Sequence, residues 1–421
     1  MATGVSRAVT LVVALLALAA GSAFAASPSS QEGPAQVGSH FVPHLKAPSV
    51  EARAALDAVL FQYDVVELPL GAVARQVRTR GELALVLQSR LFEMDLELND
   101  LRAPGFQTVL MTAQGAVEVP SPAVVTYRGT LRGEPDSIVR VTADRGMFTG
   151  MIKSGDDFLF IDPLRDYVAN APMHALVVYR EADIRPEGGG LCGVGGALSA
   201  VPGLGAEAGP SLAGPGVIAR GHTTLRRLQV ATDADGEYYQ RFGNPGTFDR
   251  IKGILNNVDG IYRNQLNLYI SITYMQAWTN PSTDPYSSND AVTNLNQFRN
   301  WWNANRTGTV RDAAHLWSGK TFNNGVIGVA WVGVICNSPS YSYGLSQDLS
   351  NSGQRTRLTA HEIGHNLSAQ HDNQIGCPGV SCNGSGPIMC SSIQPSGPNS
   401  FSSCSVSAVN NHTHNNGSCL N

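Results

Sequence analysis

The stretch His361-Glu-Ile-Gly-His-Asn-Leu-Ser-Ala-Gln-His-Asp372 decides the expected fold class and chemistry of this chain. His361 and His365 are four residues apart, so on a helix predicted over 356–368 their side chains lie on one face. His371 follows six residues after His365, beyond the predicted helix, where it can turn back toward the same point. Three imidazole ligands with one open position are typical of a catalytic zinc ion, whereas magnesium and calcium prefer oxygen ligands.

Glu362 adds a predicted reaction to this metal site. It follows the first ligand directly, where its carboxylate can reach a zinc-bound water. Zinc lowers the pKa of that water, which attacks the scissile carbonyl, while Glu362 acts as general base and later as general acid toward the leaving amine. We therefore predict a zinc-dependent endopeptidase with one catalytic zinc ion.

The same segment resembles the metzincin pattern His-Glu-x-x-His-x-x-Gly-x-x-His, and Asn366 and Asp372 resemble its adamalysin (reprolysin) branch. Pro387-Ile-Met-Cys390 resembles the Met-turn, which implies that Met389 forms a hydrophobic floor under the zinc. The resemblance covers about 224–421. It implies a zincin-type catalytic domain with a mixed twisted sheet and a long zinc-binding helix.

Ser368 departs from this pattern, because the family has glycine at that position. Glycine lets a chain leave a helix at positive φ, and a serine there costs about 1 kcal/mol of backbone strain. The substitution therefore puts the placement of His371 in question.

Six of the seven cysteines lie between 336 and 419, which in an oxidising compartment predicts up to three disulfides. Spacing alone leaves their pairing open. The resemblance implies the pairs Cys336–Cys419, Cys377–Cys404 and Cys382–Cys390.

The seventh cysteine, Cys192, stands alone in Leu191-Cys-Gly-Val194. This segment resembles the cysteine switch of adamalysin propeptides, in which a thiolate fills the open zinc position and keeps a zymogen latent. The alternatives are a stray free thiol or an intermolecular disulfide.

Four segments are expected along the chain. Residues 1–25 resemble a signal peptide, with Arg7 before a short apolar run and Ala23-Phe-Ala25 as the cleavage site, although a membrane anchor is the alternative. Short apolar runs such as 83–88 and 123–127 predict a β-rich propeptide over 26–186. A Gly/Pro-rich linker with the switch and processing zone follows at 187–221, and the catalytic domain occupies 222–421.

Alternating strands and helices predict an α/β (α+β) fold for the catalytic domain. The expected strands are 225–231, 266–274 and 326–335, and the expected helices are 247–263, 292–302 and 356–368. A protein or peptide substrate is expected to lie extended beside strand 326–335. His315 is expected to be structural, and His412 and His414 are expected to be solvated.

The net charge of −4 and the absence of a basic stripe argue against a nucleic-acid partner. We expect a secreted, extracellular monomer without a membrane partner. The main alternative function is a catalytically silent secreted binding module with the same fold, which Ser368 favours and Glu362 disfavours. A purely structural zinc would need a fourth protein ligand, for which Cys192 is the candidate.

Overall fold

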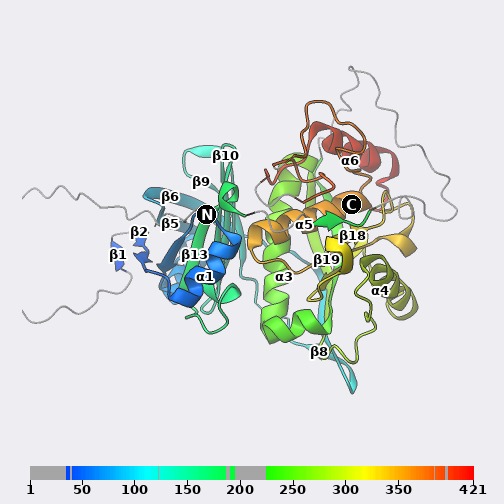
Figure 1. The fold of residues 1–421 in the computed structure, drawn as a ribbon, viewed down its shortest axis with the longest axis horizontal. Coiled ribbons are helices and arrows are strands. Elements are labelled where there is room, and N and C mark those ends of the chain that lie inside the picture. The colour runs from blue at the N-terminus through cyan, green and yellow to red at the C-terminus, as the bar shows by residue number, and fades with distance from the viewer. Residues whose placement is uncertain are drawn as a thin grey trace, which may run out of the picture.

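The computed structural model describes residues 35–37, 40–121, 123–185, 190–194, 224–383, 385–393 and 397–421, and these form two lobes (Figure 1). The N-terminal lobe contains a sheet of eleven described strands, and the C-terminal lobe contains a sheet of eight. The expected signal peptide lies outside the described residues, as do 187–189 and 195–221 of the expected linker. The chain is therefore a mixed α/β protein.

The N-terminal lobe is mostly antiparallel, apart from one parallel pairing between β2 and β5. Its strands, in sheet order, are β1 (Ala35–Val37), β2 (His40–Val42), β5 (Glu82–Leu87), β6 (Arg90–Leu98), β9 (Thr126–Leu131), β10 (Glu134–Ala143), β11 (Phe148–Ser154), β12 (Asp157–Pro163), β13 (Ala175–Arg180), β4 (Asp64–Glu67) and β3 (His44–Leu45). Its helices are α1 (Val50–Val59) and α2 (Leu70–Arg80), with short 3-10 turns η1 (Leu164–Asp166) and η2 (Glu181–Asp183). The strand predicted at 83–88 is β5, whereas the one predicted at 123–127 begins later, at Thr126.

The C-terminal sheet is mixed, as expected from the sequence. Its order is β14 (Leu191–Cys192), β18 (Val326–Ala330), β19 (Tyr343–Gln347), β17 (Ala313–Ser318), β15 (Arg226–Ala234), β16 (Leu268–Trp278), β7 (Arg102–Thr112) and β8 (Gly115–Val119). The helices of this lobe are α3 (Gly236–Leu266), α4 (Ala291–Asn305), α5 (Ser352–Asn366) and α6 (Ser403–Asn416), with 3-10 turns η3 (Asn323–Gly325) and η4 (Pro339–Tyr341). None of the helices in the described part of the chain is long and apolar enough to cross a membrane.

The predicted apolar stripe of 247–263 is the buried face of α3. Phe248, Ile251, Leu255 and Val258 are fully buried in an apolar core that extends through both lobes. The span α3 begins at Gly236, where Asp235 accepts a hydrogen bond from the Tyr238 amide at 2.8 Å, but Gly243 and Asn244 interrupt it with non-helical backbone angles. The predicted helix is the longer segment that follows this kink.

The strand predicted over 326–335 was too long, because β18 ends at Ala330. Beyond it, the amides of Gly333 and Val334 donate to the carbonyls of His365 and Asn366 at 2.9 and 3.0 Å. The apolar run therefore leaves the sheet to cover the C-terminal end of α5.

A hairpin from the N-terminal half completes the C-terminal sheet. Strand β7 pairs in parallel with β16 over Tyr274–Trp278, and β8 pairs antiparallel with β7 at the sheet edge. In Figure 1 this hairpin, in cyan, extends from the lower end of the C-terminal lobe. The sequence pattern did not predict this pairing.

Buried polar contacts join the two lobes. Arg140 on β10 lies 3.3 Å from the carboxylate of Asp259 on α3, and both side chains are nearly inaccessible. Asn99 donates to Asn256 at 2.8 Å beside them. At Gly260 an added Cβ would lie 3.0 Å from Ile138 Cγ2, so α3 packs closely on β10. If the lobes docked only partly, one of these charges would stay buried without its partner, which is costly. Complete docking of the lobes is therefore favoured.

Glu181 makes this docking sensitive to pH. It is 6% exposed, and its carboxyl group accepts a hydrogen bond from Asn399 of the C-terminal lobe. Burial raises the pKa of Glu181 from 4.5 to about 8, although the positive charge of Arg357 opposes the shift. The folded protein therefore keeps this carboxyl protonated at neutral pH, whereas the unfolded chain ionises it. The stabilising contribution is fully present below pH 4.5 and is lost as the pH rises through 8.

We expect Glu181→Gln to stabilise the protein relative to the parent at pH 9 by about 2–4 kcal/mol, and to have little effect at pH 5. The amide stays neutral at every pH, so the cost of burying a charge disappears. Unfolding midpoints of the full-length chain across pH 5–9 measure the difference. Glu118→Gln, at an exposed position on β8, is the control, and a pH-independent effect of Glu181→Gln would contradict the prediction.

Candidate metal centre

Helix α5 presents two of the predicted ligands from a fully buried position. Asn351 caps the helix by accepting from the Gln354 amide at 2.9 Å, and every residue from Ser352 to Asn366 is buried. Tyr262 of α3 donates to the Ala360 carbonyl at 2.8 Å. The buried helix therefore leaves its two histidines little freedom to move.

Each of the three histidines has a hydrogen-bond acceptor at its Nδ1 atom. His361 Nδ1 lies 2.7 Å from the Ile388 carbonyl, and His365 Nδ1 lies 2.7 Å from the Ala369 carbonyl. His371 Nδ1 lies 3.0 Å from Gln374 Oε1. Carbonyl oxygens only accept, so these contacts assign the proton to Nδ1 in each ring and leave Nε2 with a free lone pair.

The three Nε2 atoms converge on one point. His365 Nε2 lies 2.9 Å from that of His361 and 3.1 Å from that of His371. Three lone pairs facing one another in a buried space do not hydrogen-bond to one another, and a shared cation satisfies all three. Burial lowers the pKa of all three imidazoles, and that of His365 to about 3, so each is in the neutral form that binds a metal. The residues therefore fit a zinc ion.

Glu362 lies beside this point with one oxygen atom unpaired. Its Oε1 is buried without a hydrogen-bond partner, and its Oε2 lies 3.6 Å from Cys192 Sγ. Burial raises the pKa of Glu362 well above its usual value. A neighbouring cation favours the ionised carboxylate, which suits a proton acceptor next to a metal.

Cys192 follows the N-terminal lobe in the chain and lies beside the same point. Its Sγ lies 3.5 Å from His365 Nε2, and the ligand atoms of Cys192, His361, His365 and His371 all lie within 4.8 Å of one another. Burial and the Glu362 carboxylate raise the pKa of its thiol, an effect that a bound cation reverses. The other six cysteines are paired, so Cys192 is the free cysteine of the chain.

Residues 190–193 lie between two backbone segments. On one side Leu191 and Cys192 pair in parallel with Val326 and Gly328 of β18, and on the other the Cys192 amide donates to the Ser391 carbonyl at 3.0 Å. The segment expected to be part of a linker is therefore a short strand, β14, laid across the metal centre.

Met389 lies beneath the ligand helix, fully buried. An added Cβ at Gly364 of α5 would lie 3.0 Å from its sulfur and 3.2 Å from the Phe401 ring. Glycine at position 364 thus lets the helix rest on this apolar floor.

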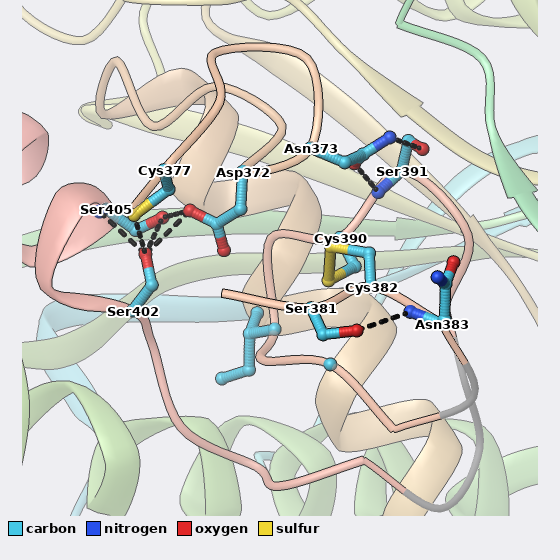
Figure 2. The surroundings of a disulfide bond; sticks show 12 residues. Asp372, Asn373, Cys377, Ser381, Cys382, Asn383, Cys390, Ser391, Ser402 and Ser405 are labelled. Atoms are coloured by element: carbon cyan, nitrogen blue, oxygen red, sulfur yellow. Dashed lines mark hydrogen bonds between the residues drawn. A yellow bond between two sulfur atoms is a disulfide. The ribbon is translucent and has the colours of Figure 1, made fainter. Parts of the chain in front are cut away.

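Asp372 fixes the loop of the third ligand. Its Oδ1 accepts from Ser402 and Ser405 at 2.6 and 2.9 Å, and Figure 2 shows this contact at the start of α6. The Asp372 amide donates to the Met389 carbonyl at 2.9 Å. The two serines were not identified as part of the site: Ser402 is the cap residue of α6, and Ser405 lies in the first turn of that helix.

His412 was expected to be solvated, and this expectation was wrong. It is 3% exposed, its Nδ1 lies 2.7 Å from Ser368 Oγ, and its Nε2 lies 3.0 Å from the Ile335 carbonyl. It lies on the inner face of α6, which local sequence does not reveal. His414 is exposed, and His315 is a buried residue of β17 hydrogen-bonded to Ser346 at 2.9 Å.

The structure joins the remaining cysteines as Cys336–Cys419, Cys377–Cys404 and Cys382–Cys390, the three pairs implied by the resemblance. The first two attach the two ends of α6 to the rest of the lobe. The third closes the loop that leads into Met389 (Figure 2).

A buried helix with two histidines, a third histidine on the following loop and an adjacent glutamate define a metalloprotease-type α/β domain. Residues 224–417 match the sequence model of metallo-peptidase family M12, of the reprolysin type. The C-terminal domain belongs to this family of reprolysin-like metzincins, whose members are zinc-dependent peptidases.

Strand β18 packs so closely on Glu362 that only glycine fits at position 328. An added Cβ would lie 2.3 Å from Glu362 Oε1 and 2.7 Å from Leu358 Cδ1. We expect Gly328→Ala to lower the free energy of unfolding by about 1–3 kcal/mol, because the strand or the carboxylate must move. Chemical denaturation measures this loss, and Gly308→Ala, where nothing lies within 4 Å, is the matched control. Equal midpoints for both variants would contradict the packing argument.

Proposed function

We propose that this chain is a secreted zinc metalloendopeptidase made as a zymogen. The observation that carries the proposal is the convergence of three unprotonated Nε2 atoms beside Glu362 inside a domain of an M12 peptidase family. We assign residues 1–25 to a signal peptide, 26–186 to a propeptide, 187–221 to a processing region and 222–421 to the catalytic domain.

His361, His365 and His371 would hold the zinc ion, with the Nδ1 contacts keeping each ring oriented. Zinc at this position supplies Lewis acidity toward a scissile carbonyl and acidity to a water molecule. Glu362 accepts the proton of the attacking water and returns it to the leaving amine. Its Oε2 supports this role, because it lies 3.6 Å from Cys192 Sγ, the atom whose place a water molecule would take.

A substrate would take the place of β14. The edge of β18 already binds an extended segment through the pairing of Leu191 with Val326 and the 2.8 Å hydrogen bond from the Gly193 amide to the Gly328 carbonyl. Once residues 190–194 leave, that edge offers the same backbone groups to a protein or peptide substrate. Pairing over several residues around the scissile bond suits an endopeptidase.

Latency would come from Cys192. Its sulfur lies where a water and the substrate carbonyl would have to be, next to both Glu362 and His365. As a thiolate it would complete four-coordination of zinc and exclude water from the centre. Cutting the chain between 195 and 224 would free the segment to leave.

We expect Glu362→Ala to retain about one zinc per chain and to lose turnover by roughly 10²–10⁴-fold, because ligands remain while the proton acceptor is gone. Zinc content and cleavage of a denatured protein substrate, on chain processed between 195 and 224, measure both properties. A chelator should abolish the activity of the parent.

Three results would count against this function. Strong residual cleavage by metal-loaded Glu362→Ala would remove the glutamate from its role. Bound zinc without cleavage in the parent would favour the silent binding module, and a parent without zinc would contradict the three-histidine site.

We expect Cys192→Ser to raise the basal activity of the uncut chain roughly tenfold or more, or to bring self-processing forward, because serine is a weak zinc ligand. Tenfold corresponds to weakening the blocked state by about 1.4 kcal/mol. Leu191→Ala, at an exposed side chain of the same strand, is the control. Unchanged latency and processing in Cys192→Ser would remove the thiol from the mechanism.

A further inference from the structure

The exit of helix α5 requires a left-handed residue at position 368. The Ser368 amide donates to the His365 carbonyl at 2.9 Å and the Ala369 amide to the Gly364 carbonyl at 3.0 Å, which is a Schellman termination. Ser368 has φ +73°, a conformation that costs a residue other than glycine about 1 kcal/mol. This turn matters for the metal centre because the Ala369 carbonyl is the acceptor of His365 Nδ1.

The Ser368 hydroxyl has a defined partner that a glycine would lack. The Ile335 carbonyl can only accept, so His412 donates to it from Nε2 and its Nδ1 is left as an acceptor. The Ser368 hydroxyl therefore donates to His412 Nδ1 at 2.7 Å. One imidazole thus links the helix exit, the 333–336 loop and α6.

Helix α6 holds the third-ligand loop at both of its ends. Ser405 contacts Asp372, next to His371, and His412 contacts Ser368 about two helical turns further along. The five-residue span from 368 to 372 is therefore fixed against one rigid helix, which the disulfides at Cys404 and Cys419 attach to the lobe.

We propose that Ser368 and His412 are a pair of positioning residues for the third zinc ligand. The hydrogen bond between them stabilises the strained turn that aims His371, and it makes His412 necessary because residue 368 is not glycine. The inference rests on the proposed zinc function and concerns how firmly this chain holds the ion.

The test is the rate of zinc release to a chelator from the full-length chain in a Glu362→Ala background, which prevents self-processing. Ser368→Ala keeps the strain and loses the hydrogen bond, so we expect release to be about tenfold faster. His412→Gln keeps a donor for the Ile335 carbonyl but not an acceptor for the Ser368 hydroxyl, so we expect the same faster zinc release as in Ser368→Ala. Ser368→Gly removes the backbone strain at residue 368, and His412→Asn keeps an acceptor for the Ser368 hydroxyl. For both variants the rate of zinc release should stay within about twofold of the parent rate.

The double variant Ser368→Gly with His412→Gln separates positioning from packing. We expect it to release zinc no faster than Ser368→Gly alone, because glycine needs no partner at this turn. Equal acceleration by His412→Gln in both backgrounds, or parental rates for Ser368→Ala, would overturn the inference while leaving the zinc site intact. A parent chain that holds no zinc would overturn the proposed function together with the inference.

Discussion

Three imidazole lone pairs pointing into one buried space are the constraint on which the rest of the structure depends. Uncompensated, they repel, and neutral acceptors without donors are costly to bury. The surrounding groups all serve to keep them there: carbonyls of Ile388 and Ala369 fix two rings, and Gln374 fixes the third. The three Nε2 atoms meet because helix α5 is buried and rests on the apolar side chain of Met389. The chain also turns back tightly at Ser368, where the helix ends. A cation turns this arrangement from a cost into a source of stability.

The same centre connects the two lobes. The thiol of Cys192 arrives from the N-terminal side and lies against His365 and Glu362, while buried pairs such as Arg140 and Asp259 fix the lobes at a distance from the metal. The zymogen proposed here is therefore held by two different kinds of contact. One is a single atom beside the three histidines, and the other is an extended interface in which buried polar pairs lie within an apolar core shared by both lobes.

The convergence of His361 and His365 could be predicted from the sequence because their spacing is local: they are one helical turn apart, and a helix fixes their relation without further information. His412 could not be predicted, because its partner Ser368 lies 44 residues away and the burial of one face of α6 is a tertiary property. The end of β18 at Ala330 was missed for a similar reason, since the apolar run beyond it is buried against α5 instead of in the sheet. Pairing of β7 with β16 is a long-range contact that strand-level patterns do not encode.

That pairing has a consequence for how the molecule is made. Residues 102–119 leave the ribosome long before 268–278, so the β7–β8 hairpin is present when β16 is synthesised and can serve as its template. A chain that began at residue 226 would lack β7 and β8, so β16 would be the edge strand of the sheet. The unpaired amides and carbonyls of such an edge can pair with other chains. In the uncut chain the hairpin therefore covers a sheet edge that the catalytic domain by itself would expose.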